Sequence, residues 1–446
     1  MKRYETYKNS GFKWFGNIPA SWDVASFKYL VEKIFAGGTP TTSKSEYWAD
    51  KSFGIPWVAI SDITKSDKFL TSTKKEITEE GRQSKGLDVL PSGTLLLSIF
   101  ASLGKTVRLG INATVNQAIL GLLPNHKLKV DYLEYLFIDA ERYISYYSSM
   151  STQENLNLSK IRNLNFPIPL IQEQTQIATY LDYKTGLIDA IIAQKEELIK
   201  KLKEQRQAII NEAVTKGLNP NVKLKDSGIE WLGDIPEHWE VIKLFGLCHL
   251  VRGNSSFKKD ELLSNGKYVA LQYGKTYKVN EVNEKYKFFV NDEFYKDSQI
   301  VNYGDTIIIS TSETIEDLGH SVFYKRKDLG LLGGEQLLLK AKSNKINPKY
   351  LFYSTKVFLK DLRKNATGVK VYRFNIDDLK NVFTSVPLML EQNSIVKHIE
   401  KKSTTIDKVV LRTQTSIKKL KEYRQSLISE AVTGKIDVRD WQAPKS

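Results

Sequence analysis

Two short segments carry residue types that bind phosphate groups. Gly104-Lys105-Thr106 and Gly274-Lys275-Thr276 both match the end of a phosphate-binding loop, in which backbone amides and a lysine hold the phosphates of ATP or GTP. The full motif needs another glycine five positions before the glycine of the Gly-Lys pair, and those positions hold Ile99 and Val269. Neither segment is therefore an ATP site. Their lysines can still approach the phosphates of a nucleic acid.

No catalytic motif occurs elsewhere in the sequence. The chain lacks the Asn-Pro-Pro-Tyr-like tetrapeptide with which amino-methyltransferases hold the target amine, and it lacks a glycine-rich cofactor loop. Its five histidines do not have the spacing of metal ligands. Nothing pairs Ser, His and Asp for nucleophilic catalysis. An enzyme of this length usually shows one of these patterns, so we expect a protein that is not catalytic by itself.

The chain is a tandem of two half-copies. Residues 200–215 read KKLKEQRQAIINEAVT, and residues 418–433 repeat them with four substitutions. Upstream, residues 8–24 (KNSGFKWFGNIPASWDV) match residues 225–241 (KDSGIEWLGDIPEHWEV). Each half thus has a constant start, a variable middle and a constant end, and its length excludes solenoid repeats of about 20–50 residues.

Composition indicates a globular protein with a polyanionic partner. Of the 446 residues, 41% are hydrophobic and 26% are charged, and no apolar run approaches the roughly 20 residues of a membrane span. The N-terminus does not resemble a secretory signal, and the single Cys248 fits a reducing compartment, so we expect a cytoplasmic protein. A net charge of +15 favours nucleic acid as a partner, although a basic solvated surface alone would also produce it.

The constant end of each half predicts a long helix. Apolar residues recur there at intervals of three and four, which places them on one helix face: Ile188, Ile191, Leu198, Leu202 and Ile209 in the first copy, and Ile406, Val409, Ile417, Leu420 and Leu427 in the second. Each helix would run for about 28–35 residues, a length typical of coiled coils. We expect the two to pack together. Packing of each helix on its own domain is the alternative.

The variable middles predict short strands and helices. The apolar runs 94–99 and 306–310 each follow a glycine, as buried strands do. Short helices are expected over 131–147 and 348–364. The fold class is therefore α+β, with two globular domains that each end in a long helix.

The constant segments resemble the specificity subunit of type I restriction-modification systems. The pattern S-G-x-x-W-x-G-x-I-P-x-x-W occurs at 10–22 and again at 227–239, and a Pro-containing segment followed by a long helix ending in E-A-V-T occurs twice. Gly37-Gly38-Thr39-Pro40, Trp57 and Asn116-Gln117 follow the order common in that family. The resemblance covers essentially the whole chain.

The resemblance implies two target-recognition domains and two helical spacers. We expect residues 1–170 and 219–388 to form the recognition domains, residues 171–218 and 389–437 to form the conserved helices as an antiparallel coiled coil, and residues 438–446 to form a tail. The partners implied are double-stranded DNA, two modification (methyltransferase) subunits docked on the helices, and restriction (translocase-nuclease) subunits. The cofactors belong to those partners, with S-adenosylmethionine in the methyltransferase and ATP and magnesium in the translocase-nuclease. None is expected on this chain.

Reading of DNA needs side chains that hydrogen-bond to base edges or phosphates. The candidates in the variable loops are Ser61, Lys65, Ser102, Lys105, Gln153 and Asn155 in the first half, and Arg252, Asn254, Gln272, Lys275, Thr311, Lys370 and Arg373 in the second. The second half has Val251-Arg252-Gly253-Asn254-Ser255 near the place of Gly37–Pro40. We therefore expect two different half-sites and an asymmetric target.

Two further predictions concern the frame and an alternative function. The paired tryptophans lie in constant segments and are expected to seat each domain against the helices: Trp14, Trp22, Trp231 and Trp239. A coiled-coil scaffold that joins protein partners without contacting DNA is the alternative function.

Overall fold

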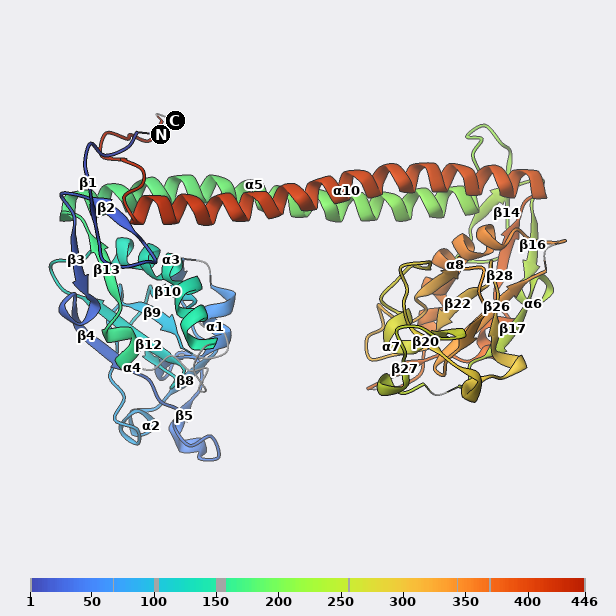
Figure 1. Cartoon of the computed structure of the whole chain (residues 1–446). Helices are drawn as coiled ribbons and strands as arrows, with labels where there is room; N and C mark the ends of the chain where they lie inside the picture. Colours follow the sequence, from blue (N-terminus) through green and yellow to red (C-terminus); the bar gives the residue numbers. More distant parts are fainter. Residues whose placement is uncertain are drawn as a thin grey trace. The chain divides into compact units, whose positions relative to one another are not determined.

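A computed structural model describes residues 2–66, 68–99, 104–149, 158–255, 257–342, 344–368 and 370–444, with the side chains of 142–149 and 365 excepted. Its contacts divide the chain into unit 1 (residues 1–195 and 415–446) and unit 2 (residues 196–414). Each unit contains one variable middle, the beginning of one long helix and the end of the other. The sequence repeat is thus a structural repeat in which each unit borrows a helix segment from the other half (Figure 1).

In unit 1 the described residues form two main sheets. The five-stranded sheet has the order β4 (Val31–Ala36), β12 (Ile119–Pro124), β9 (Leu95–Ser98), β10 (Thr106–Leu109) and β7 (Phe69–Leu70). The four-stranded sheet has the order β11 (Thr114–Val115), β6 (Ile55–Val58), β8 (Lys75–Ile77) and β5 (Trp48–Ala49). The short helices are α1 (Ile60–Lys65), α2 (Glu79–Gln83) and α4 (Leu158–Arg162). Helix α3 (Val130–Ser149) packs on β10 and β12, so the central strand β9 is buried along its whole length.

Unit 2 repeats this arrangement with different residues. Its described five-stranded sheet has the order β17 (Cys248–Arg252), β26 (Gln336–Ala341), β22 (Thr306–Ile309), β24 (Ser321–Tyr324) and β19 (Glu281–Val282). Its four-stranded sheet has the order β20 (Phe289–Val290), β18 (Tyr268–Leu271), β25 (Gly330–Leu332) and β21 (Ile300–Val301). The short helices are α6 (Leu244–Leu247), α7 (Tyr273–Thr276) and α9 (Ile376–Lys380). Helix α8 (Pro348–Leu362) packs on β22, β24 and β26 as α3 packs on its sheet. The predicted strands and short helices of both middles are confirmed.

Two-stranded sheets join the constant segments of each half. In unit 1 these are β1 (Tyr7–Asn9) with β2 (Asn17–Pro19), and β3 (Asp23–Ser26) with β13 (Asn165–Ile168). In unit 2 they are β14 (Leu224–Asp226) with β15 (Asp234–Pro236), and β16 (Glu240–Lys243) with β28 (Phe383–Val386). A further two-stranded sheet, β23 (Thr311–Ser312) with β27 (Tyr372–Arg373), lies within the variable middle of unit 2. The strand before each long helix therefore pairs with a strand near the start of the same half.

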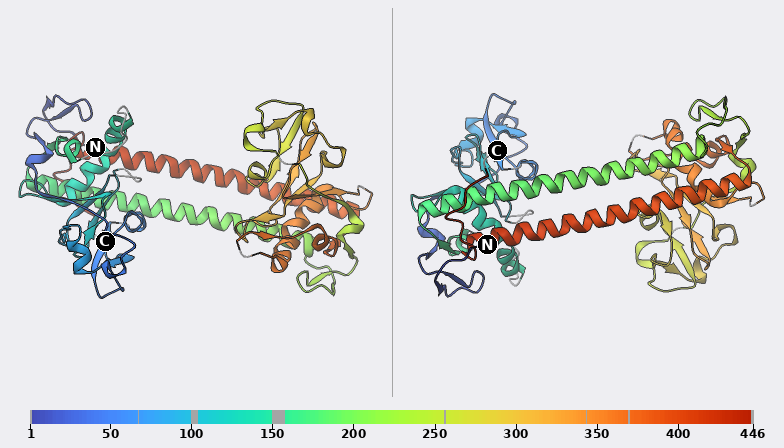
Figure 2. Two further views of the ribbon diagram at one scale, coloured as in Figure 1. Left: turned by 90° about the horizontal axis from the view of Figure 1, so that it is seen from below. Right: turned by 90° about the horizontal axis from the view of Figure 1, so that it is seen from above.

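The two long helices are α5 (Ile171–Thr215) and α10 (Met389–Val432), of 45 and 44 residues. Within each unit the beginning of one lies beside the end of the other, so the segments are antiparallel (Figure 2). Arg424 bonds to Asp189 in unit 1 at 2.9 Å between Nε and Oδ1, and Arg206 pairs with Asp407 in unit 2. The predicted antiparallel pair is confirmed. Among the described residues, no helix is both long and apolar enough to cross a membrane.

The helices are longer than the 28–35 residues predicted from the apolar spacing. The extra length lies at their beginnings, where buried apolar side chains continue the same helix face. Ile177 and Leu181 of α5 and Ile395 and Ile399 of α10 are fully buried. In α10 these residues belong to the core of unit 2, so the first turns pack on a domain as well as on the other helix.

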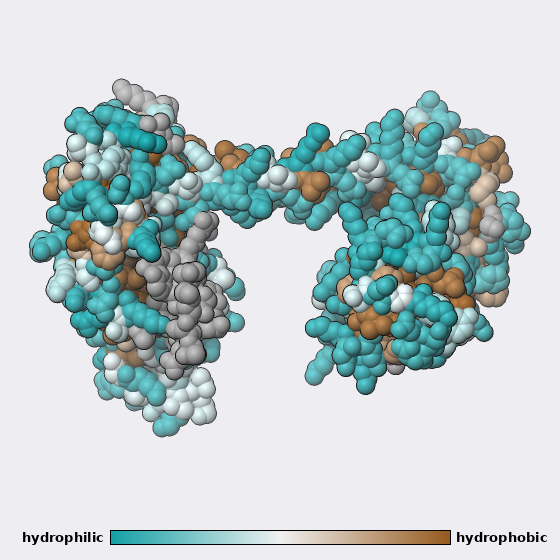
Figure 3. Space-filling view, viewed as in Figure 1, coloured by the Kyte–Doolittle hydropathy of each residue, from teal (hydrophilic) through white to brown (hydrophobic). Residues whose placement is uncertain are grey.

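The predicted apolar stripe is only partly an interface between the helices. Ile188, Ile406 and Ile417 are buried, whereas Ile191 and Leu198 are 42% and 43% exposed. The stripe prediction is therefore wrong for those two residues and for Val409, which is 37% exposed. A pair of helices covers only one side of each partner, which leaves the remaining face open to solvent. On the face seen in Figure 3, hydrophilic side chains cover most of both helices and apolar ones are scattered among them.

Two of the four tryptophans, Trp22 and Trp239, seat each domain on a long helix as predicted, whereas the half-buried Trp14 and Trp231 pack on Phe166 and Phe358. Trp22 is fully buried and its Nε1 donates to Glu173 near the start of α5 at 3.1 Å. Trp239 is equally buried and donates to Glu391 near the start of α10 at 3.1 Å. The indole N–H is a neutral donor, so each glutamate keeps its negative charge. That charge lies near a helix N-terminus, where the helix dipole stabilises it. The constant segments are thus the frame of the molecule.

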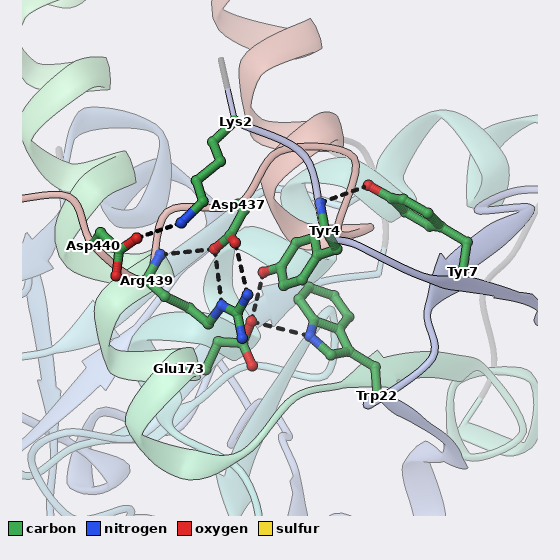
Figure 4. Close-up of polar contacts among 8 residues, drawn as sticks. All are labelled: Lys2, Tyr4, Tyr7, Trp22, Glu173, Asp437, Arg439 and Asp440. Atoms are coloured by element: carbon green, nitrogen blue, oxygen red, sulfur yellow. Dashed lines mark hydrogen bonds and ion pairs between the residues drawn. The ribbon is translucent and has the colours of Figure 1, made fainter.

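In unit 1 the two ends of the chain meet over the start of α5 (Figure 4). Lys2 Nζ lies 2.5 Å from Asp440 Oδ2, and the guanidinium of Arg439 lies 5.0 Å from the ring centroid of Tyr4. The Tyr4 hydroxyl donates to Glu173 at 2.5 Å. In unit 1, noncovalent contacts therefore hold the segment after α10 against the segment before β1. In unit 2 the equivalent link is covalent, because the chain runs directly from α5 into β14.

Candidate nucleic-acid interface

In unit 1 the residues of the glycine-rich segment meet the Asn-Gln pair. Gly37 directly follows β4, and a Cβ at this position would lie 1.9 Å from the carbonyl oxygen of Asn116. The Thr39 hydroxyl donates to the side chain of Gln117. Trp57 Nε1 donates to Gly38 O at 2.9 Å. The sequence positions that suggested a family therefore form one structural feature, in which glycine is required because two backbones cross in contact.

Unit 2 builds the same crossing from a different sequence. Gly253 directly follows β17, and a Cβ there would lie 1.9 Å from the carbonyl oxygen of Gly333. Gly334 N donates to Ser255 O at 2.6 Å, and Gly253 N donates to Gln336 O at 2.9 Å. The backbone is conserved between the halves while the side chains on it differ. Ser255 stands where unit 1 has Thr39.

Polar side chains surround a cleft of about 240 Å³ at this crossing in unit 2. Four of the predicted candidates line it, namely Arg252, Asn254, Thr311 and Arg373. Thr311 and Arg373 are directly opposite each other because β23 pairs with β27. The tertiary structure thus brings together residues that are up to 121 positions apart in the sequence.

Two buried polar atoms at the cleft have no partner among the described residues. Gln336 is 1% exposed and Ser255 is 3% exposed, yet Gln336 Oε1 and Ser255 Oγ accept or donate no hydrogen bond. Gln336 Nε2 donates to Leu271 O at 2.6 Å, which fixes the amide so that Oε1 is the free acceptor. Leaving such groups without a partner costs about 1–3 kcal/mol each, so these atoms are suited to a ligand or a bridging water.

Glu335 adds an acceptor in an unusual backbone conformation. Its φ is 60°, in the left-handed region that residues with a Cβ rarely adopt. Its carboxylate accepts a hydrogen bond from the Thr311 hydroxyl. Strained positions of this kind concentrate at functional sites. Ser255, Glu335 and Gln336 were not among the predicted residues, and Gly333-Gly334 was the available signal because paired glycines inside an apolar run indicate a close backbone contact.

The remaining candidates of unit 2 lie outside this cleft. Gln272 occupies the position before α7 without a side-chain capping bond, and its Oε1 is buried without a partner in the described part of the chain. Lys275, on α7, has its Nζ 4.7 Å from the Phe288 ring centroid and lines a larger cleft. Lys370 is exposed.

In unit 1 the structure brings α1 and the Gly104-Lys105 segment together. Ser61 and Lys65 are exposed on α1, and Lys105 Nζ donates to Thr64 O near the end of that helix at 3.0 Å. The Lys105 ammonium therefore caps a helix C-terminus, where the dipole favours a cation. Ser102, Gln153 and Asn155 lie outside the described residues.

The described residues contain no group of three or more His, Cys, Asp or Glu side chains that could hold a metal ion. The single thiol, Cys248, is fully buried, and burial raises its pKa to about 12. The geometry offers donors and acceptors on two related crossings, which is what recognition of base edges and phosphates requires. Fold and site together define a tandem recognition protein with two related but non-identical sites.

Comparisons with known proteins identify the family. A family model described as the type I restriction modification DNA specificity domain matches residues 19–201 and again residues 236–418. The type I restriction enzyme MjaIX specificity subunit of Methanocaldococcus jannaschii is 26% identical over 440 residues, covering 95% of this chain and 96% of that protein. The putative MjaX specificity subunit of the same organism is 25% identical, covering 97% and 98% of the two chains.

A solved structure agrees in fold. A chain from work on complex assembly and conformational transition of the type I R-M system has a TM-score of 0.70 at 15% identity, and the match covers 93% of this chain and 98% of that one. Because the family model matches most of the sequence in two tandem copies, the chain belongs to the type I restriction-modification DNA specificity family. It is a DNA-recognition component that is not itself catalytic, and its partners are DNA and the other subunits of such a system.

Proposed function

We propose that each unit reads one half of a split, asymmetric DNA sequence, and that the crossing after β17 is the reading site of unit 2. The observation that carries this proposal is the shared backbone crossing with different side chains. The backbone contact between Gly37 and Asn116 in unit 1 has the same geometry as the contact between Gly253 and Gly333 in unit 2. Unit 1 carries the bonded side chains of Thr39 and Gln117 at this place, whereas unit 2 has a cleft lined by Ser255. One backbone with two side-chain sets suits two half-sites of different sequence.

Donors and acceptors occur together in the unit 2 cleft. Arg252 and Arg373 can donate to a guanine edge or to phosphates, and Glu335 and Gln336 can accept from the amino groups of cytosine or adenine. In unit 1 we assign Ser61, Lys65 and Lys105 to the same role, and the bond of the Lys105 ammonium to Thr64 O holds this lysine beside α1. The recognition domains in this proposal are residues 1–170 and 219–388.

The assignment is tested by mapping the methylated DNA sequences that are produced with cleft variants in which an arginine is replaced by neutral glutamine. Arg252→Gln and Arg373→Gln are expected to relax the sequence requirement in one half of the target only, by roughly 5–150-fold per base pair read. Lys342→Gln is a matched control, because Lys342 lies in the same unit at the far end of the β17–β26 pairing, near Cys248. If the variants methylated the same sequence as the unaltered protein in both halves of the target, the assignment of the reading site would be wrong.

We further propose that α5 and α10 dock two modification subunits. Exposed apolar side chains support this, because Leu198 is 43% and Leu411 is 66% exposed on helices that cover only one side of each other. Burial of exposed apolar surface is the dominant favourable term in most protein–protein association. Leu411→Glu is expected to abolish co-purification of the modification subunit while leaving the helical content unchanged. Lys408→Glu, on the same helix, is the control for added negative charge.

A further inference from the structure

A large basic cleft lies in unit 2 between α8 on one side and the segments of α5 and α10 on the other. Its volume is about 1130 Å³, and its described lining contains eight Lys and Arg residues against three Asp and Glu residues. Seven of the basic residues come from α7, α8 and neighbouring segments of the globular domain, and Arg206 comes from α5.

The acidic residues of the cleft are already paired within the protein. Glu281 bonds to Lys349 and lies 3.4 Å from Lys325 Nζ. Asp407 pairs with Arg206, and Glu400 lies 3.9 Å from the Lys349 ammonium. Of the eight basic residues in the described lining, Arg206 and Lys325 take part in these pairs, and the other six form no ion pair with the three carboxylates.

Three of the basic residues line the cleft from α8 and the turn just after it. Lys356, Lys360 and Arg363 are spaced by four and three residues, which puts them on one helix face. Burial and the charge of Lys349 lower the pKa of Lys356 to about 7, and burial lowers the pKa of Lys360 and Arg363. A lowered pKa means that a charged lysine is disfavoured in the free protein, and a bound anion would reverse this.

Among the described residues, only the cleft of unit 2 has this excess of basic side chains. The corresponding cleft of unit 1, between α3 and the long helices, has a volume of about 1110 Å³. Its described lining has three basic and four acidic residues, and two of the basic ones are paired, Lys68 with Asp182 and Arg424 with Asp189. At the position that matches Lys356 in unit 2, α3 has Ile138.

We propose that the basic cleft of unit 2 holds the sugar-phosphate backbone of duplex DNA. The aromatic and aliphatic residues in its lining are largely buried, with Phe352 at 4% and Leu359 at 2% exposure, so the cleft presents charge and few apolar anchors. Protein partners usually need such anchors, whereas phosphates need lysine and arginine alone. The cleft strengthens binding without reading sequence. This proposal rests on DNA recognition as the function of the chain.

A charge-removal experiment separates this role from base reading. Lys278, Lys285 and Lys360 are exposed, so their replacement by Gln leaves the core intact. The matched control replaces Lys267, Lys327 and Lys380 by Gln, three exposed lysines of the same unit that do not line the cleft. The full chain with its modification subunits is titrated with a duplex that carries its target and with a scrambled duplex at several salt concentrations.

We expect the cleft variant to lose affinity for both duplexes by the same factor, roughly tenfold per lysine near 0.1 M salt. The slope of log affinity against log salt concentration should fall by about 0.9 for each phosphate that the variant no longer neutralises. The control should bind as the unaltered protein does. A cleft variant with unaltered DNA affinity and salt slope would overturn the proposal, and a failure to bind the modification subunits instead would assign the cleft to an acidic protein surface. If the unaltered complex bound neither duplex, DNA recognition itself would fall as well.

Discussion

Glu335 combines backbone strain with the proposed role in reading DNA, and substitutions can separate the two. Its φ of 60° costs a residue with a Cβ about 1 kcal/mol relative to glycine. Its carboxylate faces the cleft and accepts the Thr311 hydroxyl. Glu335→Gly and Glu335→Ala both remove the carboxylate, but only the glycine variant also removes the strain.

We therefore expect the glycine variant to be more stable than the alanine variant by about 1 kcal/mol, a difference in thermal midpoint of roughly 2–4 °C for a unit of this size. Both variants should lose the same discrimination at one position of the unit 2 half-site, roughly 5–150-fold, because one acceptor to a base is worth about 1–3 kcal/mol.

Calorimetry and binding to duplexes altered at each base pair of that half-site provide the two measurements. Equal stability of the two variants would show that the left-handed conformation is not retained in solution. Undiminished discrimination in both would remove Glu335 from the reading site. A loss of discrimination in the alanine variant alone would mean that the position acts through backbone geometry rather than through its carboxylate.

Three further predictions concern buried groups. Burial raises the pKa of Asp305 to about 6, so the native state holds this proton more tightly and stability is lost as the pH rises from about 4 to 6. Asp305→Asn, which keeps an acceptor for Asn302 N at 2.8 Å, should remove this loss of about 1–3 kcal/mol in urea titrations at pH 4.5 and 7; an unchanged pH dependence would refute the assignment. Trp239→Leu should lower the free energy of unfolding by about 2–4 kcal/mol, because the indole is fully buried and bonded to Glu391, and a loss below about 1 kcal/mol would contradict its role as a seat. Cys248 should react with iodoacetamide at neutral pH only after unfolding, because burial raises its thiol pKa to about 12, and rapid modification of the folded chain, followed by mass spectrometry, would contradict this.

The division between frame and recognition surface follows from these interactions. Trp22 and Trp239 bond to equivalent glutamates of the long helices, so the same seat is used in both units. The reading crossings and the clefts beside α3 and α8 differ in side chains and charge. A change of target therefore needs changes only on surfaces that the frame does not use.

Much of this protein was accessible from the sequence because its signals are local or repeated. The spacing of apolar residues predicted both long helices, the glycine-led apolar runs predicted β9 and β22, and the two half-copies predicted a structural repeat. Such patterns depend on the period of a helix or strand and need no knowledge of distant contacts.

Only the tertiary structure decided which polar residues share a site. Arg252, Thr311 and Arg373 are brought together by strand pairing across the unit, and Lys105 caps α1 instead of standing free. The exposure of Ile191 and Leu198 depends on how many helices surround each face, which periodicity does not encode. Pairing between distant strands, burial and charge compensation are sums over interactions between separate parts of the chain, so a pattern read along one segment cannot supply them.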